Sequence, residues 1–361
     1  MKYYIYVILL LALITACAPT KEIVTEKVEV IKEVVVEKPC ECTKYELPPD
    51  WKDDVKREEK IKSFSSVLTG VKFFIDPGHG GKDRHGKSKD GSVVEADVNL
   101  RVSLYLRNYL QKAGAIVYMS RMADSTVDLK YRSELANKSG ADFFISVHHN
   151  APGNSNDNWT NFTSTYYHAT EEDYEFNHCN KDLARYIQRD LAYVMDNSNG
   201  LGSFDGTYSD YNIYPKEGFS VLRRTNIPAV LIEGSFFTNP TEQRRLNIEE
   251  FNDIQAWGIF RGIGRYLTAG LPKIAFLKDR SIISEGTAKL VFNLSDKSGI
   301  NVKSIKVFFD SSEVEYTYDK KTGNLIVEVN KLKKGEYEVK VIASNKNGNH
   351  ALPFIQKIRY K

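Results

Sequence analysis

The sequence predicts an α/β domain with a mixed, mainly parallel sheet flanked by helices, followed by a small all-β domain. Three short apolar runs, at 71–75, 143–148 and 229–233, are typical of buried strands. Helical patterns separate these runs, and strands that alternate with helices favour a sheet covered on both faces. From residue 273 onward, polar and apolar residues alternate in short runs, which indicates an antiparallel β-sandwich.

The α/β domain is expected to span residues 70–270. Apolar residues recur at helical spacing over 95–112, which predicts a helix with one buried face. Asn239-Pro240 predicts the start of a final helical region that reaches about residue 267. Between these helices we expect a strand at 115–119, a helix at 129–139, a strand ending at His148, a short strand at 165–167, a helix at 171–195 and a strand ending at Glu233.

The N-terminus has the features of a targeting segment, and residues 1–16 are predicted to be a lipoprotein signal peptide. Its apolar stretch from Tyr3 to Ala16 is too short to span a bilayer comfortably as a helix. Leu13-Ile14-Thr15-Ala16-Cys17 resembles a bacterial lipobox, which implies that Cys17 becomes a lipidated, membrane-anchoring N-terminus. An ordinary cleaved signal with a chance cysteine is the alternative. We therefore expect a lipid-anchored protein of the cell envelope that faces the periplasm, with the outer membrane as its site.

Residues 17–69 are expected to form the lipidated N-terminus and a charged stalk or linker. Glu and Lys alternate with Val and Ile from Thr20 to Lys38. Four β-branched residues have heptad spacing, namely Val24, Val28, Ile31 and Val35. They cover fewer than two heptads, which is too short for a convincing coiled coil, so an extended charged spacer is the preferred interpretation.

Charge and cysteine content exclude some classes of protein. A net charge of +3 over 361 residues is not the signature of a nucleic-acid-binding protein, so we expect no nucleic-acid partner. Beyond Cys17, the chain contains Cys40, Cys42 and Cys179. The first two are too close for an easy unstrained bridge, and no pair of motifs fits a structural zinc site.

Four titratable residues lie at or near the ends of the apolar runs. His79 follows the first run, His148 and Glu233 close the second and third, and Glu95 begins the predicted helix. Side chains at the carboxyl ends of strands can converge on one site in an open α/β sheet. Two imidazoles and one carboxylate are a known catalytic zinc set, and a further glutamate can act as the general base.

Each of these residues also has a structural interpretation when it is taken alone. Glu95 could simply favour the positive end of a helix dipole. His149 adjoins His148, but neighbouring side chains of a strand point to opposite faces, so only one of them should reach a metal. His85 is expected to be a solvated loop histidine.

Several separated motifs occur in a specific order. They are Ile75-Asp76-Pro77-Gly78-His79-Gly80-Gly81, Glu95 with Asn99-Leu100, Arg121 with Asp124, Arg132 with Ala136-Asn137, Ser146-Val147-His148-His149-Asn150, Val221-Leu222-Arg223, Pro228-Ala229-Val230-Leu231-Ile232-Glu233-Gly234, and Asn239. This order resembles the zinc-dependent N-acetylmuramoyl-L-alanine amidases of bacterial cell walls (type 3 family) over about residues 71–268. The resemblance implies one zinc ion held by His79, Glu95 and His148, with Glu233 as the catalytic carboxylate.

The resemblance further implies a peptidoglycan hydrolase. Such an enzyme cleaves the amide between the lactyl group of N-acetylmuramic acid and L-alanine of the stem peptide. Two alternatives stay open: a regulatory or wall-binding protein on an amidase scaffold, and a zinc amidase or peptidase that acts on another amide bond. The segment between His148 and Glu233 is also long enough for a helix that occludes the site until an activator moves it, although the helix at 171–195 is expected to be packed scaffold.

Residues 273–361 carry 17 lysine and arginine residues against 10 aspartate and glutamate residues, a net charge of +7. The segments 294–300 and 343–349 resemble parts of bacterial immunoglobulin-like modules. The charge suits contact with an anionic wall polymer, and a protein activator is a further expected partner of this region. A spacer with a lysine-rich, solvated surface is the alternative.

Overall fold

The computed structural model describes residues 21–24, 34–37, 47–197 and 205–361, which belong to two compact units, Met1–Glu46 and Leu47–Lys361. The predicted signal peptide, Cys17, Cys40 and Cys42 lie outside the described residues. In the first unit, β1 (Lys21–Val24) pairs antiparallel with β2 (Val34–Glu37). Val24 and Val35 therefore belong to strands, contrary to the coiled-coil alternative. Among the described residues, no helix is long and apolar enough to cross a membrane.

The second unit is built on a six-stranded sheet with the order β4-β3-β5-β8-β6-β7. Its parallel part consists of β4 (Ile116–Met119), β3 (Lys72–Pro77), β5 (Phe143–Asn150) and β8 (Ala229–Phe236). Strand β6 (Ser164–Tyr167) is antiparallel to β8, and β7 (Thr207–Ser209) runs parallel to β6. The predicted mixed, mainly parallel sheet is confirmed.

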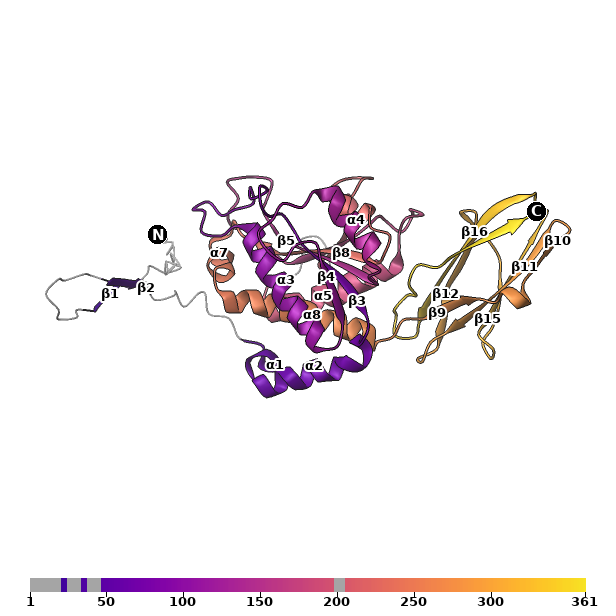
Figure 1. Cartoon of the computed structure of the whole chain (residues 1–361), viewed down its shortest axis with the longest axis horizontal. Coiled ribbons are helices and arrows are strands. Elements are labelled where there is room, and N and C mark those ends of the chain that lie inside the picture. The colour runs from indigo at the N-terminus through magenta and orange to yellow at the C-terminus, as the bar shows by residue number, and fades with distance from the viewer. Residues whose placement is uncertain (1–20, 25–33, 38–46, 198–204) are drawn as a thin grey trace, which may run out of the picture. The chain divides into compact units, whose positions relative to one another are not determined.

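Helices cover both faces of this sheet (Figure 1). One layer contains α3 (Glu95–Lys112), α5 (His178–Met195) and α8 (Glu249–Thr268), which pack side by side. The other contains α4 (Leu129–Ser139) and α6 (Ser220–Arg223). Successive strand residues alternate between the layers, so Phe74 and Phe144 join the buried cluster with Ala136 of α4 and Leu222 of α6. Helix α7 (Pro240–Leu246) is capped by Asn239, whose side chain accepts hydrogen bonds from Thr241 N and Glu242 N, as the Asn-Pro pair predicted.

The predicted stalk ends earlier than expected. Residues 49–68, which we assigned to the linker, form α1 (Pro49–Lys52) and α2 (Asp54–Leu68). Helix α2 lies against α8 on the side away from the sheet (Figure 1). The Phe64 ring meets the Phe260 ring edge-on at 5.7 Å and fills the space beside Gly264. The segment is rich in charged residues, and only Ile61, Phe64 and Leu68 of α2 are buried, so the helical pattern of apolar residues is weak there.

Helix α5 begins at His178, seven residues later than predicted. Thr170 explains the difference, because its backbone N–H and hydroxyl both donate to Asp173 Oδ2 and close a turn there. The helix packs against α8 and β6, so it is scaffold, as expected. The short helix η2 (Asp210–Asn212) follows β7.

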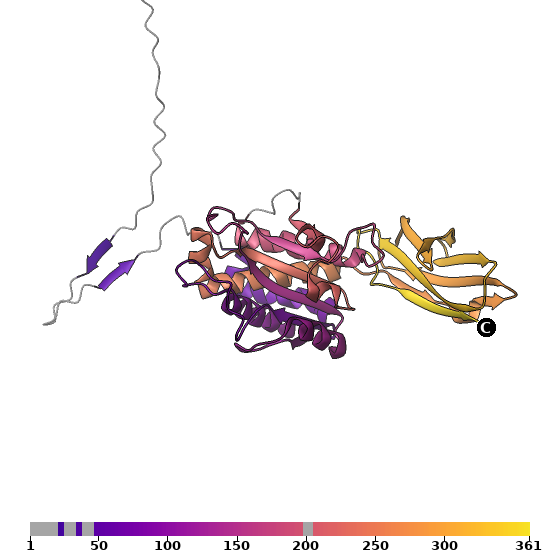
Figure 2. The same cartoon turned by 90° about the horizontal axis from the view of Figure 1, so that it is seen from above.

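After α8, the chain forms an all-β region (Figure 2), which confirms the second part of the predicted fold class. One antiparallel sheet contains β9 (Lys273–Phe276), β10 (Ile282–Ser284), β11 (Thr287–Ser295), β15 (Asn324–Asn330) and β14 (Thr317–Asp319). The other contains β13 (Ser312–Glu313), β12 (Ile300–Phe309), β16 (Gly335–Asn345) and β17 (Ile355–Tyr360). Phe292, Val307 and Val341 belong to the buried cluster between them. The helical turn η3 (Lys278–Arg280) links β9 to β10.

Polar contacts join the all-β region to the α/β region. Asn345 Nδ2 donates to the carbonyl oxygens of Ala269 and Gly270, at 3.0 and 3.1 Å, and Asn349 Nδ2 donates to Tyr266 O at 2.9 Å. Lys340 Nζ donates to the carbonyl oxygen of Tyr174 at 2.7 Å. The asparagine bonds hold the end of β16 and the loop after it against the end of α8, and the Lys340 bond holds β16 against the segment before α5.

Candidate active site

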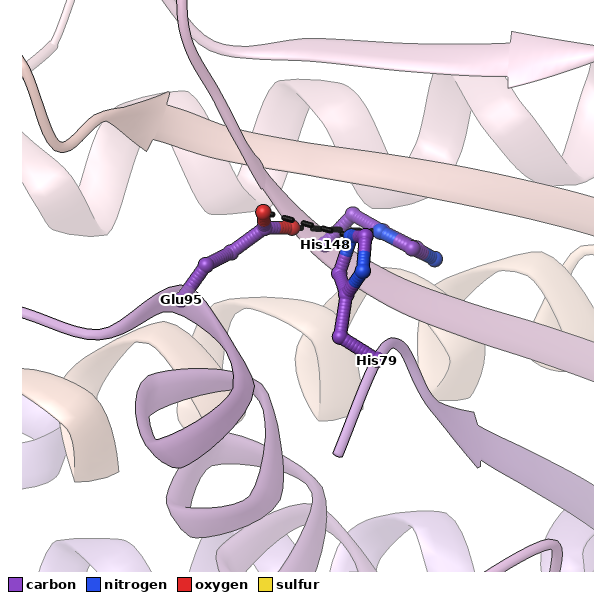
Figure 3. A group of neighbouring side chains, drawn as sticks. All are labelled: His79, Glu95 and His148. Carbon is purple, nitrogen blue, oxygen red and sulfur yellow. Dashed lines mark hydrogen bonds and ion pairs between the residues drawn. The ribbon is translucent and has the colours of Figure 1, made fainter. Parts of the chain in front are cut away.

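Three of the four predicted site residues form one cluster at the carboxyl edge of the parallel strands. His79 follows β3, His148 lies near the end of β5, and Glu95 is the first residue of α3 (Figure 3). One nitrogen or oxygen from each side chain lies within 4.8 Å of the others. This is the edge at which ligands bind in open α/β sheets.

The spacing of the donor atoms fits a small metal ion. Glu95 Oε2 lies 3.2 Å from His79 Nε2, and Glu95 Oε1 lies 3.2 Å from His148 Nδ1. Donors at about 2.1 Å from a tetrahedral zinc ion lie about 3.4 Å from one another. The triad could therefore bind a metal ion, and its two nitrogens and one carboxylate are the donor types that zinc accepts.

Two glycines make room for this cluster. A Cβ at Gly78 would lie 2.2 Å from His148 Cε1, and a Cβ at Gly86 would lie 2.3 Å from Glu95 Oε2. Both distances are far shorter than any real carbon contact, so a side chain at either position must displace a donor. The glycine in the Asp-Pro-Gly-His motif is required by the close approach of the His148 ring.

The surroundings of Glu95 favour its ionised form, a carboxylate between the two imidazoles. Burial opposes the charged form of Glu95, but hydrogen bonds and the field of His148 and His79 outweigh it and lower the pKa of the Glu95 carboxyl. Burial lowers the pKa of His79, but the carboxylates of Glu95 and Asp83 raise it by more. The net effect is a pKa of about 9 for His79. The site therefore holds a carboxylate that attracts cations strongly, whether these are protons or a metal ion.

Glu233 lies beside this cluster but does not belong to it. On adjacent parallel strands it pairs in register with His148 of β5, and on its other side it pairs with Ser164 of β6. Its Oε2 atom is inaccessible to solvent and has no hydrogen-bond partner within the described ranges. Burial, reinforced by the negative field of Glu95, raises the pKa of the Glu233 carboxyl well above its ordinary value. A buried carboxyl with a raised pKa is suited to proton transfer.

Groups behind the cluster hold it in place: Asp83, which the sequence analysis did not name, and Asn99, which it placed in a motif without giving it a role. Asp83 Oδ2 lies 2.7 Å from His79 Nδ1, so the other ring nitrogen is free for a metal. Asn99 Nδ2 donates to Glu95 Oε1 at 3.2 Å and to Gly78 O at 3.3 Å. Asn99 stands one helical turn after Glu95, and this spacing is the signal that could have identified it.

Two buried arginines clamp the turn that carries His79. Arg132 donates to Pro77 O, to His79 O and to the buried carboxylate of Asp76. Arg121 donates to Pro77 O and, through Nη2, to the carbonyl oxygens of Gly78 and Ala96. Both side chains therefore hold the turn in place from behind.

The side chains of His149, His85 and His168 lie outside the triad, while the backbone N–H of His149 donates to Glu95 Oε1 at 3.1 Å. His149 is buried, with Nδ1 at 2.8 Å from Asn99 Oδ1 and Nε2 at 2.7 Å from Gln255 Oε1. His148 and His149 thus point to opposite faces of β5, as the strand geometry predicted. His85 is exposed and lies outside the triad, whereas His168 is bound to Asp210 at 2.9 Å.

Comparison with known proteins agrees with this geometry. The family model for N-acetylmuramoyl-L-alanine amidase matches residues 73–265. The germination-specific N-acetylmuramoyl-L-alanine amidase of Bacillus subtilis is 32% identical over 232 residues, which are 60% of this chain and 89% of that protein. The amidase CwlM of Bacillus licheniformis is 33% identical over 200 residues, 54% of this chain and 68% of the relative.

Among solved structures, the N-acetylmuramoyl-L-alanine amidase from Clostridium difficile 630 is 33% identical, with a TM-score of 0.48, and the match covers 56% of this chain and 99% of that one. The match with the germination-specific relative covers most of that protein, and the family model covers the segment that contains His79, Glu95, His148 and Glu233. The chain therefore belongs to the N-acetylmuramoyl-L-alanine amidase family, whose members act on bacterial cell walls.

Proposed function

We propose that this chain is a zinc-dependent peptidoglycan hydrolase that cleaves the amide between the lactyl group of N-acetylmuramic acid and L-alanine of the stem peptide. The observation that carries the proposal is the register of β5 and β8. It brings His148 of the triad and the buried carboxyl of Glu233 to neighbouring positions at one edge of the sheet. A metal site beside a proton-transfer group is what hydrolysis of an amide requires.

His79, Glu95 and His148 would hold the zinc ion. The equal donor separations of 3.2 Å and the space left by Gly78 support this assignment. Bound zinc supplies Lewis acidity, which polarises the amide carbonyl and lowers the pKa of a water molecule from ~16 toward ~7. Three protein donors leave one position of a tetrahedral site open, as in catalytic zinc sites.

Glu233 would move the protons. Burial and the field of Glu95 raise the pKa of the Glu233 carboxyl, which makes its carboxylate a stronger base. The carboxylate would take a proton from the attacking water, and the carboxylic acid so formed would return that proton to the departing amine of L-alanine. The C–N bond breaks as the amine accepts that proton, which leaves a lactyl carboxylate on the glycan and a free stem peptide. The Oε2 atom without a partner among the described residues is available for this transfer.

Digestion of purified muropeptides, analysed by mass spectrometry, tests the proposal. We expect free stem peptide and intact glycan from the zinc-loaded chain, and a loss of rate of about 10²–10⁴-fold in Glu233→Gln. The variant should still bind one equivalent of zinc, measured by elemental analysis, because Glu233 is not a proposed ligand. Products cut within the stem peptide would instead favour a peptidase. Binding of wall without cleavage would favour a regulatory protein on an amidase scaffold.

We also propose that Cys17 is lipidated and anchors the chain in the cell envelope, facing the periplasm from the outer membrane. The lipobox-like sequence before Cys17 supports this, and the cell-wall substrate of the family requires a location outside the cytoplasm. Metabolic labelling with a fatty-acid analogue should mark the chain but not Cys17→Ser. Fractionation should then place the labelled chain in the outer membrane, and recovery in the inner membrane would refute that part.

For the rest of the chain, we propose the predicted division into a catalytic domain at 70–270 and an immunoglobulin-like domain at 273–361. We propose a wall polymer or a protein activator as the partner of the immunoglobulin-like domain. The two antiparallel sheets around one core support an independent domain. Differential scanning calorimetry tests the division. Two separable transitions are expected for two domains, and a single transition would indicate one cooperative unit.

A further inference from the structure

The all-β region contains a cleft of about 570 Å³ with an unusual lining. Its lining includes Asn301, Lys303, Tyr318, Lys320, Asn345 and Lys346. Three lysines contribute to the lining, and no carboxylate does. The volume lies within the range of about 300–1,000 Å³ that is common for ligand sites.

The three lysines of this cleft lack counter-charges. Lys303, Lys320 and Lys346 are exposed, and in the described part of the chain none of them lies within ion-pair distance of a carboxylate. Among the basic residues of the same region, ion pairs are formed by Lys289 with Glu328 at 3.6 Å, Lys357 with Glu338 at 3.2 Å and Arg359 with Glu336 at 3.8 Å. A cleft lined by charges of one sign concentrates ligands of the opposite sign.

An irregularity of β12 places Lys303 in this cleft. The pairing of β12 with β16 shifts register between Asn301 and Lys306. Asn301 stabilises the bulge, because its Oδ1 accepts from Lys303 N and its backbone oxygen accepts from the Ser304 hydroxyl. Bulges redirect side chains and are frequent beside functional sites.

The other walls add groups that suit a sugar. Tyr318, on the edge strand β14, offers an aromatic face together with a hydroxyl. Asn345 is buried, and it links the cleft to the end of α8 through its bonds to Ala269 and Gly270. The same short loop, 345–349, therefore borders the cleft and contacts the α/β region.

We propose that this cleft, named here the lysine cleft, binds a carboxylate-bearing segment of the peptidoglycan glycan as a second, non-catalytic contact with the substrate polymer. The ammonium groups of Lys303, Lys320 and Lys346 would pair with carboxylates, and Tyr318 would lie against a sugar ring. The identity of the polymer rests on the proposed function. Its carboxylates come from two sources: the stem peptides before cleavage, or the lactyl groups that cleavage releases on the glycan.

Co-sedimentation of the full chain with insoluble peptidoglycan tests the lysine cleft. All binding variants carry Glu233→Gln so that the polymer stays intact. Lys303→Gln/Lys320→Gln/Lys346→Gln is compared with a matched control, Lys278→Gln/Lys333→Gln/Lys334→Gln, which removes the same charge from exposed lysines outside the cleft. We expect binding about tenfold weaker for the cleft variant, the sum of three exposed ion pairs, and a change below about twofold for the control.

Two polymer preparations identify the carboxylates. One retains its stem peptides, and the other has been stripped of them. Selective loss of binding to the intact polymer assigns the carboxylates to stem peptides, and selective loss with stripped strands assigns them to lactyl groups; both results support the proposal. Equal losses in the cleft and control variants, no loss in either, or binding to phosphatidylglycerol vesicles but to neither polymer would overturn it.

Cleavage of a soluble muropeptide separates this inference from the proposed function. With Glu233 present, the cleft and control variants should cleave it at the wild-type rate, because none of these lysines belongs to the catalytic cluster. Normal cleavage without a binding difference refutes the lysine cleft alone. Absent cleavage in every variant, with the binding difference intact, refutes the hydrolase and leaves the cleft as a polymer-binding site.

Discussion

Gly78 and the imidazole of His148 are in such close proximity that no side chain fits between them, since a Cβ at position 78 would lie 2.2 Å from His148 Cε1. We therefore expect Gly78→Ala to displace His148 and to weaken zinc binding by at least about tenfold, as the loss of a well-placed ligand does. Competition with a chromogenic chelator measures the affinity. Gly153→Ala is the control, because a Cβ there meets nothing within 4 Å. Equal affinities in the two variants would contradict the role of Gly78.

Asp83 provides a second test of the proposed metal site. Its carboxylate lies 2.7 Å from His79 Nδ1 and orients the ring. We expect Asp83→Ala to lower zinc affinity about 10–100-fold, the usual effect of removing a group that orients a metal-bound histidine. Asp83→Asn retains an oxygen acceptor and should give an intermediate value in the same chelator assay. An unchanged affinity in Asp83→Ala would show that the hydrogen bond has no part in metal binding.

Arg132 should contribute to stability more than to chemistry. It forms a buried ion pair with Asp76 at 2.7 Å and also donates to two backbone oxygens of the His79 turn. Removing one partner of a buried pair leaves an uncompensated charge, so Arg132→Ala is expected to lower the free energy of unfolding by about 3–5 kcal/mol. Urea denaturation measures this change in the free energy of unfolding. Lys130→Ala on the exposed face of the same helix should change it by less than about 0.5 kcal/mol.

The histidine pair near the start of α5 predicts a pH dependence of stability. His178 and His350 stack with ring centroids 4.5 Å apart. Burial and the positive field of His350 lower the pKa of His178 to about 4, compared with an ordinary value near 6.5 in the unfolded chain. Between these values the unfolded chain binds a proton that the folded chain does not, so stability falls as the pH drops from about 6.5 toward 4.

Substitution of His178 measures this contribution. In His178→Phe the linkage is absent, so the melting temperature should fall less between pH 7 and pH 4.5 than in the wild type. At pH 4.5 we expect the pH-dependent loss in free energy of unfolding to be about 2 kcal/mol smaller in His178→Phe than in the wild type, after allowance for the partial solvation of the half-buried ring. His85→Gln, in an exposed loop, should follow the wild-type profile. Parallel profiles for His178→Phe and the wild type would contradict the prediction.

Short-range sequence patterns were sufficient to predict the elements that position the site. The buried runs before His79, His148 and Glu233 identified the three strands, and the alternation along β5 separated His148 from His149. In each case the signal lies in a few consecutive residues, because burial on both sheet faces and the two-residue period of a strand act locally.

Long-range packing explains what local rules missed. Helix α2 has only a few apolar residues, and its burial depends on the ring of Phe260 and the gap at Gly264, about 200 residues away in sequence. The seven-residue error at the start of α5 came from the Thr170–Asp173 turn, a side-chain bond that competes with the helix. The lysine cleft joins positions from three strands and the following loops, so no window of sequence reveals it.

Asn345 at the end of β16 and Asn349 in the loop after it have a consequence for how the molecule melts. The last carbonyl groups of a helix have no partner within it, and for α8 the carbonyl oxygens of Tyr266 and Ala269 accept from Asn349 and Asn345. The β-region thus acts as the C-terminal cap of α8, supplied from about 80 residues further along the chain. Removal of the all-β region would uncover these carbonyls, fray α8 and speed amide exchange in the helix against which both α3 and α5 pack.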